Sequence, residues 1–118
     1  MKIISFAQTT PALLAGRKTC TRRQWNPRYA ALFHAGDLVQ AYDKNPRNGG
    51  KPVTIIQLIQ APYLDTHLLT TDWEAEGFAY MEEHRLTLFN GKTPRQVWEH
   101  WREAEALVGY YVVRFKLM

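Results

Sequence analysis

Residues 43–52, DKNPRNGGKP, restrict the fold more than any other part of the sequence. Asn, Gly and Pro at this density are typical of a tight turn. The turn lies between two apolar segments, LVQAY at 38–42 and VTIIQLIQ at 53–60. The second segment is rich in β-branched residues and is predicted to be a strand. The sequence therefore predicts a β-hairpin in the middle of the chain.

Further strands and helices flank this hairpin. KIISF at 2–6 and GYYVVRFKL at 109–117 are predicted strands. Three segments are predicted helices because each has a threonine placed as its cap: residues 9–16 with Thr10, residues 71–84 with a Thr71–Glu74 capping box, and residues 93–107 with a Thr93–Gln96 capping box. The elements lack a β-α-β rhythm, so we expect an α+β fold in which helices flank a small antiparallel sheet or barrel.

The composition is that of one folded domain over residues 1–118. The formal net charge of +4 permits an anionic partner such as nucleic acid without requiring one. One cysteine cannot form an internal disulfide. No apolar run approaches the roughly eighteen residues of a membrane span, and the apolar run at the start is too short for a signal peptide. These features predict a soluble, cytoplasmic protein without a membrane partner.

Metal and cofactor chemistry find little support in the sequence. The four histidines, at positions 34, 67, 84 and 100, have no ligand spacing with each other or with Cys20. No glycine-rich phosphate loop of either common type is present. We therefore predict neither a metal nor a cofactor.

The stretch GRKTCTRRQW, residues 16–25, is the main candidate for function. It carries four cations within seven residues, together with two threonines and the chain's only cysteine. No apolar stripe runs through it, so it is a poor core element. Such a stretch is either a solvated loop or the lining of a site.

The spacing in this stretch resembles the signature of the ASCH family, a branch of the PUA-like β-barrels. That signature is G-x-K-x-x-E-x-R, and Gly16, Lys18 and Arg23 match three of its four marked positions. Thr21 stands where the family usually has Glu. Gly36-Asp37 before a strand and the EGF at 76–78 agree with the resemblance, which implies a small PUA-like barrel with flanking helices.

The threonine at this position is similar to that of the small bacterial ASCH enzymes that remove the acetyl group from acetylcytidine. Those enzymes use a Lys, a Thr and a Glu. By position the resemblance implies Lys18, Thr21 and Glu76 as catalytic residues. Glu74 competes with Glu76, because helix boundaries are soft.

The residue types suit this chemistry without the family. A threonine hydroxyl is a weak nucleophile that needs a base. Lys18 can be that base if burial or the neighbouring arginines depress its pKa. A carboxyl group can then move a proton to the leaving amine. Side chains alternate along a strand, so Lys18 and Thr21 are expected to share a site only if the segment is turn-like.

Other residues are candidates for binding substrate. Arg23 can hold a carbonyl oxygen or a phosphate through its planar fork. Trp25 and, more weakly, Tyr42 can stack on a base. The full set of predicted binding residues is Arg17, Arg22, Arg23, Trp25, Tyr42 and Lys44. If Thr21 faces the site, its neighbour Cys20 is expected to face the core rather than to act as a nucleophile.

The sequence predicts recognition of a nucleoside or of single-stranded RNA. The leading function is hydrolysis of an amide on an acylated cytidine-type base. The alternative is an RNA-binding module, or a ribonuclease, that uses the same basic cleft. RNA would need a basic track leading away from the pocket, for which the candidates are Lys44, Arg47, Lys51, Arg114 and Lys116.

Overall fold

The computed structural model describes residues 1–65, 70–104 and 109–118. It contains six strands, β1 (Lys2–Ser5), β2 (Cys20–Arg23), β3 (Leu38–Tyr42), β4 (Pro52–Leu58), β5 (Tyr63–Leu64) and β6 (Tyr111–Leu117). The α-helices are α1 (Thr10–Leu14), α2 (Pro27–Ala30), α3 (Phe78–Glu83) and α4 (Pro94–Ala104). Four short 3₁₀ helices complete the description: η1 (Ala7–Thr9), η2 (Pro46–Asn48), η3 (Thr70–Trp73) and η4 (Phe89–Gly91).

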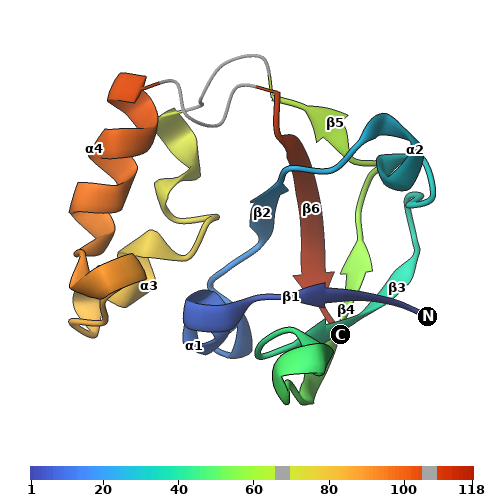
Figure 1. Cartoon of the computed structure of the whole chain (residues 1–118), viewed down its shortest axis with the longest axis horizontal. Helices are drawn as coiled ribbons and strands as arrows, with labels where there is room; N and C mark the ends of the chain where they lie inside the picture. The colour runs from blue at the N-terminus through green and yellow to red at the C-terminus, as the bar shows by residue number, and fades with distance from the viewer. Residues whose placement is uncertain (66–69, 105–108) are drawn as a thin grey trace.

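The strands form one curled sheet in the order β1-β3-β4-β6-β2, and β5 also pairs with β6. The sheet curls into a half-barrel, and α3 and α4 stand together on one flank of it (Figure 1). The fold is thus mixed α+β, as predicted. One pairing corrects the expectation of an antiparallel sheet, because β1 runs parallel to β3.

The predicted strands are confirmed. β3 and β4 form the antiparallel hairpin around residues 43–51. The closing strand β6 pairs antiparallel with β2, β4 and β5. Alternate residues of the strands, such as Val113 and Phe115 of β6, enter one core with Leu13 of α1.

The helix predictions succeed at one capping box and fail at the other. The Thr93 amide donates to the Gln96 side chain and the Gln96 amide donates to the Thr93 hydroxyl, which opens α4 as predicted. Residues 105–107, the end of that predicted helix, lie outside the described residues. The Thr71–Glu74 box is wrong, since α3 begins only at Phe78. The prediction that Thr10 caps the first helix is also wrong, because Thr10 is the first residue of α1 and Thr9 occupies the cap position of that helix.

The buried apolar side chains form two cores. The first gathers side chains of β1, β3, β4 and β6 together with Phe6, Leu13 and Phe33. The second joins α1, α3 and α4 through Ala12, Phe78, Met81 and Trp98, with Trp73 and Trp101 packed at its edge. None of the described helices is long and apolar enough to cross a membrane.

Candidate functional site

Backbone hydrogen bonds position the first half of the cationic stretch. Helix α1 ends at Leu14, and Gly16 turns the chain with a left-handed φ of 75°. The amides of Arg17 and Lys18 then both donate to the carbonyl of Ala12. The chain next crosses to Ala75, whose carbonyl accepts from the amides of Thr19 and Cys20. Strand β2 begins at that point.

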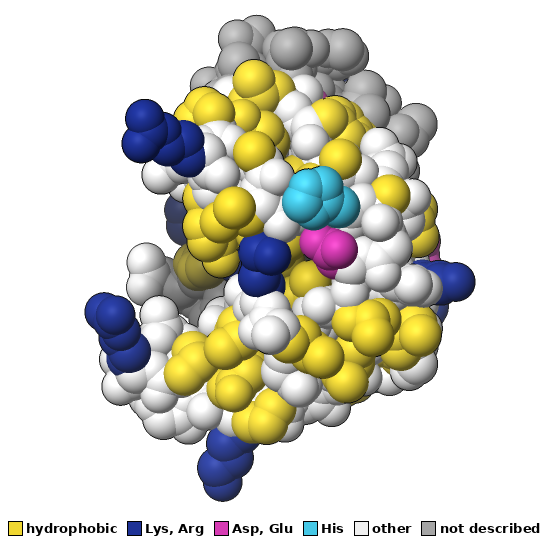
Figure 2. Space-filling model, turned by 90° about the vertical axis from the view of Figure 1, so that its right-hand side faces the viewer, with side chains coloured by type: hydrophobic (Ala, Val, Ile, Leu, Met, Phe, Trp, Pro, Cys, Tyr) yellow, Lys and Arg dark blue, Asp and Glu magenta, His cyan; other side chains and the backbone are white. Residues whose placement is uncertain are grey.

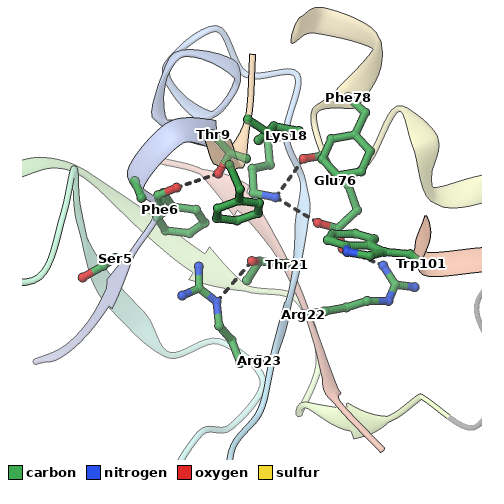
Figure 3. Close-up of a pocket in the computed structure, with 13 residues that line it drawn as sticks. Ser5, Phe6, Thr9, Lys18, Thr21, Arg22, Arg23, Glu76, Phe78 and Trp101 are labelled. Carbon is green, nitrogen blue, oxygen red and sulfur yellow. Dashed lines mark hydrogen bonds and ion pairs between the residues drawn. The ribbon is translucent and has the colours of Figure 1, made fainter. Parts of the chain in front are cut away.

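A pocket of about 260 Å³ lies against this stretch. It is lined by Ser5, Phe6, Ala7, Thr9, Lys18, Thr21, Arg22, Arg23, Glu76, Phe78, Leu88, Phe89 and Trp101. Figure 3 shows Lys18 and Glu76 meeting at one side of this pocket and Thr21 with Arg23 at the other. The predicted residues Lys18, Thr21 and Glu76 therefore border one space, although 55 or more positions separate Glu76 from the other two.

Lys18 and Glu76 form a buried ion pair. Lys18 is 3% exposed and Glu76 is 2% exposed. Lys18 Nζ donates to Glu76 Oε1 at 3.1 Å and to the Glu76 backbone carbonyl at 2.8 Å. The ammonium group can make three hydrogen bonds, so one N–H direction remains for a group in the pocket.

Glu76, rather than Glu74, is the carboxylate at the pocket. It lies in the turn that precedes α3, which corrects the prediction that it belongs to a helix. Gly77 follows it with φ of 91°, and a Cβ at Gly77 would lie 2.8 Å from Cβ of Ala12. A side chain at this position would push the turn away from Lys18. Glu74 is exposed and pairs with Arg17 outside the pocket.

Thr21 and Arg23 form the other side of the site. Both lie on β2, so the expectation that residues 18–21 are all turn-like is wrong. Lys18 still reaches the pocket because it precedes the strand and does not follow its alternation. Arg23 Nε donates to Thr21 Oγ1 at 3.2 Å. Thr21 Oγ1 accepts this bond and donates none to a described residue, so its proton is available to a ligand.

Arg22 is the centre of a buried charge network and not a free binding residue. Its side chain is 1% exposed. Nε donates to Asp65 at 2.8 Å, Nη2 to Asp72 at 2.6 Å, and Nη1 to Glu76 Oε2 at 2.6 Å. All three directions of the guanidinium fork are thus occupied by carboxylates. Arg22 borders the pocket, but its role there is to hold Glu76.

Asp72 joins Arg22 to a second arginine. Arg114 on β6 donates to Asp72 Oδ2 at 2.9 Å and to the hydroxyl of Tyr63, also at 2.9 Å. Burial would raise the pKa of Asp72, but hydrogen bonds from Arg114 and Arg22 outweigh burial and lower that pKa. Arg114 therefore serves this network rather than a basic track for RNA.

Four of the predicted binding residues lie outside the pocket lining. Arg17 is engaged by Glu74 and Glu83. Trp25 stacks on Phe33 with 4.5 Å between ring centroids and packs against the first core, so its predicted base stacking finds no support in the pocket. Tyr42 ends β3, and Lys44 is exposed in the β3–β4 loop.

Cys20 is fully buried, as predicted. Its thiol lies 3.6 Å from Glu76 Oε2. Burial, followed by the charge of Glu76, raises the pKa of the Cys20 thiol. A thiol that resists ionisation is a poor nucleophile, which agrees with the structural role expected for it.

Sequence reasoning missed two parts of the site. One is the aromatic lining, which comes from four separate segments of the chain and consists of Phe6, Phe78, Phe89 and Trp101. The other is the pairing of Arg22 with Asp65 and Asp72. The chain gives little signal for either, because both depend on contacts between distant segments. Within residues 1–65, 70–104 and 109–118 no group of three or more metal-ligating side chains is present.

No protein-family model, curated protein or solved structure matches this chain. The likeness to the ASCH family thus stays a prediction from residues 16–23 and their surroundings.

Proposed function

We propose that this protein is an amidohydrolase that removes the acyl group from the amino nitrogen of an acylated cytidine-type base. One observation carries the proposal: Lys18, Thr21 and Glu76 line the same pocket, and Lys18 Nζ donates a hydrogen bond to the Glu76 carboxylate. A nucleophile, a base and an acid of the types that amide hydrolysis requires are therefore available to one small ligand.

The pocket suits a flat, mostly apolar ligand. Its volume of about 260 Å³ is at the small end of ligand sites. The rings of Phe6, Phe78 and Trp101 supply apolar walls, while Lys18, Thr21 and Arg23 supply polar groups. An acylated pyrimidine has this combination of a planar ring and a few hydrogen-bonding atoms.

The reaction follows from these groups in two steps. Lys18, after giving a proton to Glu76, accepts the Thr21 hydroxyl proton while Oγ1 bonds to the acyl carbon. The C–N bond then breaks, and the leaving amino nitrogen receives a proton from Glu76. Lys18 then passes a proton to Glu76 once more, and water adds to the acyl carbon as it gives a proton to the Lys18 amine. The Oγ1–C bond breaks, Oγ1 takes its proton back from Glu76, and the acid is released.

A panel of acylated cytidines tests the proposal, with products identified by mass spectrometry. We expect release of free cytidine and the matching carboxylic acid. Glu76→Gln should remove most of the activity because glutamine cannot transfer a proton. Glu74→Gln is the matched control and should keep it, since Glu74 is exposed and outside the pocket. If no acylated cytidine is turned over, the proposal fails.

An RNA-binding module using the same pocket is the second candidate. Phe89 favours it, because this pocket residue is 57% exposed and offers a ring on which a second base can stack. The surface charge favours it less. Arg17 and Arg114 are paired with carboxylates, and on the face in Figure 2 the Lys and Arg side chains stand apart from one another.

Salt separates the two candidates. RNA held by Lys44, Arg47 and Lys51 would release counterions on binding, so the logarithm of its affinity should fall with a slope of about −2 against the logarithm of salt concentration. Hydrolysis of an uncharged nucleoside should change little over the same range. We expect salt-insensitive turnover, measured between low and high potassium chloride. Steeply salt-dependent RNA binding without turnover would favour the binding module instead.

A further inference from the structure

The cations that line the pocket differ in how their charge is balanced. Lys18 pairs with Glu76, and Arg22 pairs with three carboxylates. Arg23 has no ion-pair partner among the residues that the structure describes. The pocket therefore holds a positive charge whose counterion is still to be supplied.

Arg23 is half-buried, and its surroundings offset its charge only in part. Its guanidinium carbon lies 5.4 Å from the ring centroid of Phe6. Burial lowers the pKa of Arg23, and the charge of Glu76 opposes this only in part. A half-buried cation without a carboxylate partner attracts an anion that enters the pocket more strongly than a fully exposed cation would.

The free N–H groups of Arg23 are arranged to donate to the two oxygens of a carboxylate. Only Nε is engaged, by Thr21 Oγ1. The two terminal nitrogens make no hydrogen bond within the described part of the chain, and Figure 3 shows them on the pocket side, toward Phe6. Guanidinium N–H groups donate in parallel and match a carboxylate. The Thr21 hydroxyl adds a further donor beside them, because its proton is free.

We propose that Arg23 and the Thr21 hydroxyl form the acyl subsite of the pocket, and that this subsite binds a small carboxylate. The identity of that carboxylate rests on the proposed function: it is the acid released by hydrolysis. In the substrate the terminal nitrogens of Arg23 hold the acyl carbonyl oxygen, while Thr21 Oγ1 attacks the acyl carbon. The hydrogen bonds from Arg23 strengthen as that oxygen becomes negative, since no carboxylate among the described residues competes for these nitrogens.

Two consequences follow for the reaction. The released acid stays bound between Arg23 and Thr21 and inhibits competitively with substrate. The subsite also selects acyl groups that place an oxygen on Arg23 and a short apolar chain near Phe6. An acetyl or propionyl group satisfies both requirements within a pocket of about 260 Å³.

Titration of the isotopically labelled full chain with sodium acetate tests the subsite directly. We expect the NMR resonance of Arg23 Nε–H to shift in a saturable manner, at constant ionic strength. Acetamide, which has the same shape without the charge, should bind at least about tenfold more weakly. No activity is needed for this measurement.

Substitutions sharpen the test. Arg23→Met should weaken acetate binding at least about tenfold, because both charge and fork are lost. Arg23→Lys should fall between Arg23→Met and the unmodified chain, since it keeps the charge but not the fork. Arg28→Met is the matched control: it removes one exposed arginine from α2, outside the pocket, and should leave acetate binding unchanged. Thermal melting checks that each variant is folded.

The outcomes separate this inference from the proposed function. Acetate binding at Arg23 without turnover of any acylated cytidine would support the subsite and remove the amidohydrolase. Turnover without any acetate-induced shift at Arg23, or with equal affinity in Arg23→Met, would overturn the subsite and leave the amidohydrolase standing. If Arg23→Met does not fold, the resonance of the unmodified chain decides.

Discussion

Thr21→Ala is expected to reduce turnover of an acylated cytidine by about a thousandfold or more. The substitution removes the oxygen that would attack the acyl carbon. It also removes the acceptor of the Arg23 Nε hydrogen bond. Substrate binding should change little, because the aromatic walls of the pocket remain. Single-turnover kinetics and equilibrium binding of the substrate measure the two effects separately.

Three comparisons decide how Thr21 acts. Thr21→Ser should keep part of the activity because it retains the hydroxyl. Lys18→Ala should be about as severe as Thr21→Ala, since base and nucleophile act as one unit and their losses are not additive. Cys20→Ser should keep turnover, because the thiol is buried and its pKa is raised. Near-normal turnover by Thr21→Ala would instead assign the attack to water and leave Thr21 as a positioning residue.

Arg22→Met is expected to lower the free energy of unfolding by about 3–5 kcal/mol at neutral pH. Arg22 bonds three buried carboxylates from three places in the chain, Asp65, Asp72 and Glu76. Removing the arginine leaves Asp65 without its ion-pair partner and the other two each with one cation. Urea denaturation at pH 7 measures the change.

The loss of stability caused by Arg22→Met should be smaller at acidic pH than at neutral pH. In the unmodified protein the lowered pKa of Asp72 makes a stabilising contribution that is present above its ordinary pKa of about 3.9 and is lost as pH falls through the lowered value. In Arg22→Met, protonation of the buried carboxylates removes their unpaired negative charge and with it the cost of burying that charge. The two proteins should therefore differ less near pH 4 than at pH 7.

Arg17→Met is the control for the stability of Arg22→Met. Arg17 also bonds two carboxylates, but its side chain is 35% exposed and water replaces those bonds. Its substitution should therefore have a much smaller effect on unfolding. If the two substitutions lowered the free energy of unfolding equally, burial would not explain how much the Arg22 network stabilises the protein.

The sequence alone determined the parts of the molecule that depend on neighbours along the chain. The β3–β4 hairpin follows from the density of turn formers between two apolar segments. The capping box of Thr93 and Gln96 opens α4 because its two hydrogen bonds join residues three positions apart. The spacing of Gly16, Lys18, Thr21 and Arg23 likewise pointed to the segment that borders the pocket.

Only the tertiary structure decided which charges meet. Thr71 and Glu74 carry the local signal of a helix start, yet the left-handed turn at Gly77 delays α3 to Phe78 and places Glu76 against Lys18. Four cations close in sequence look equivalent, but the alternation of β2 sends Arg22 to buried carboxylates and Arg23 to the pocket. Local preference is worth a fraction of a kcal/mol per residue, whereas leaving a buried charge unpaired costs several. The pairing of distant charges therefore overrides local preference, and it can be seen only once the distant segments are brought together.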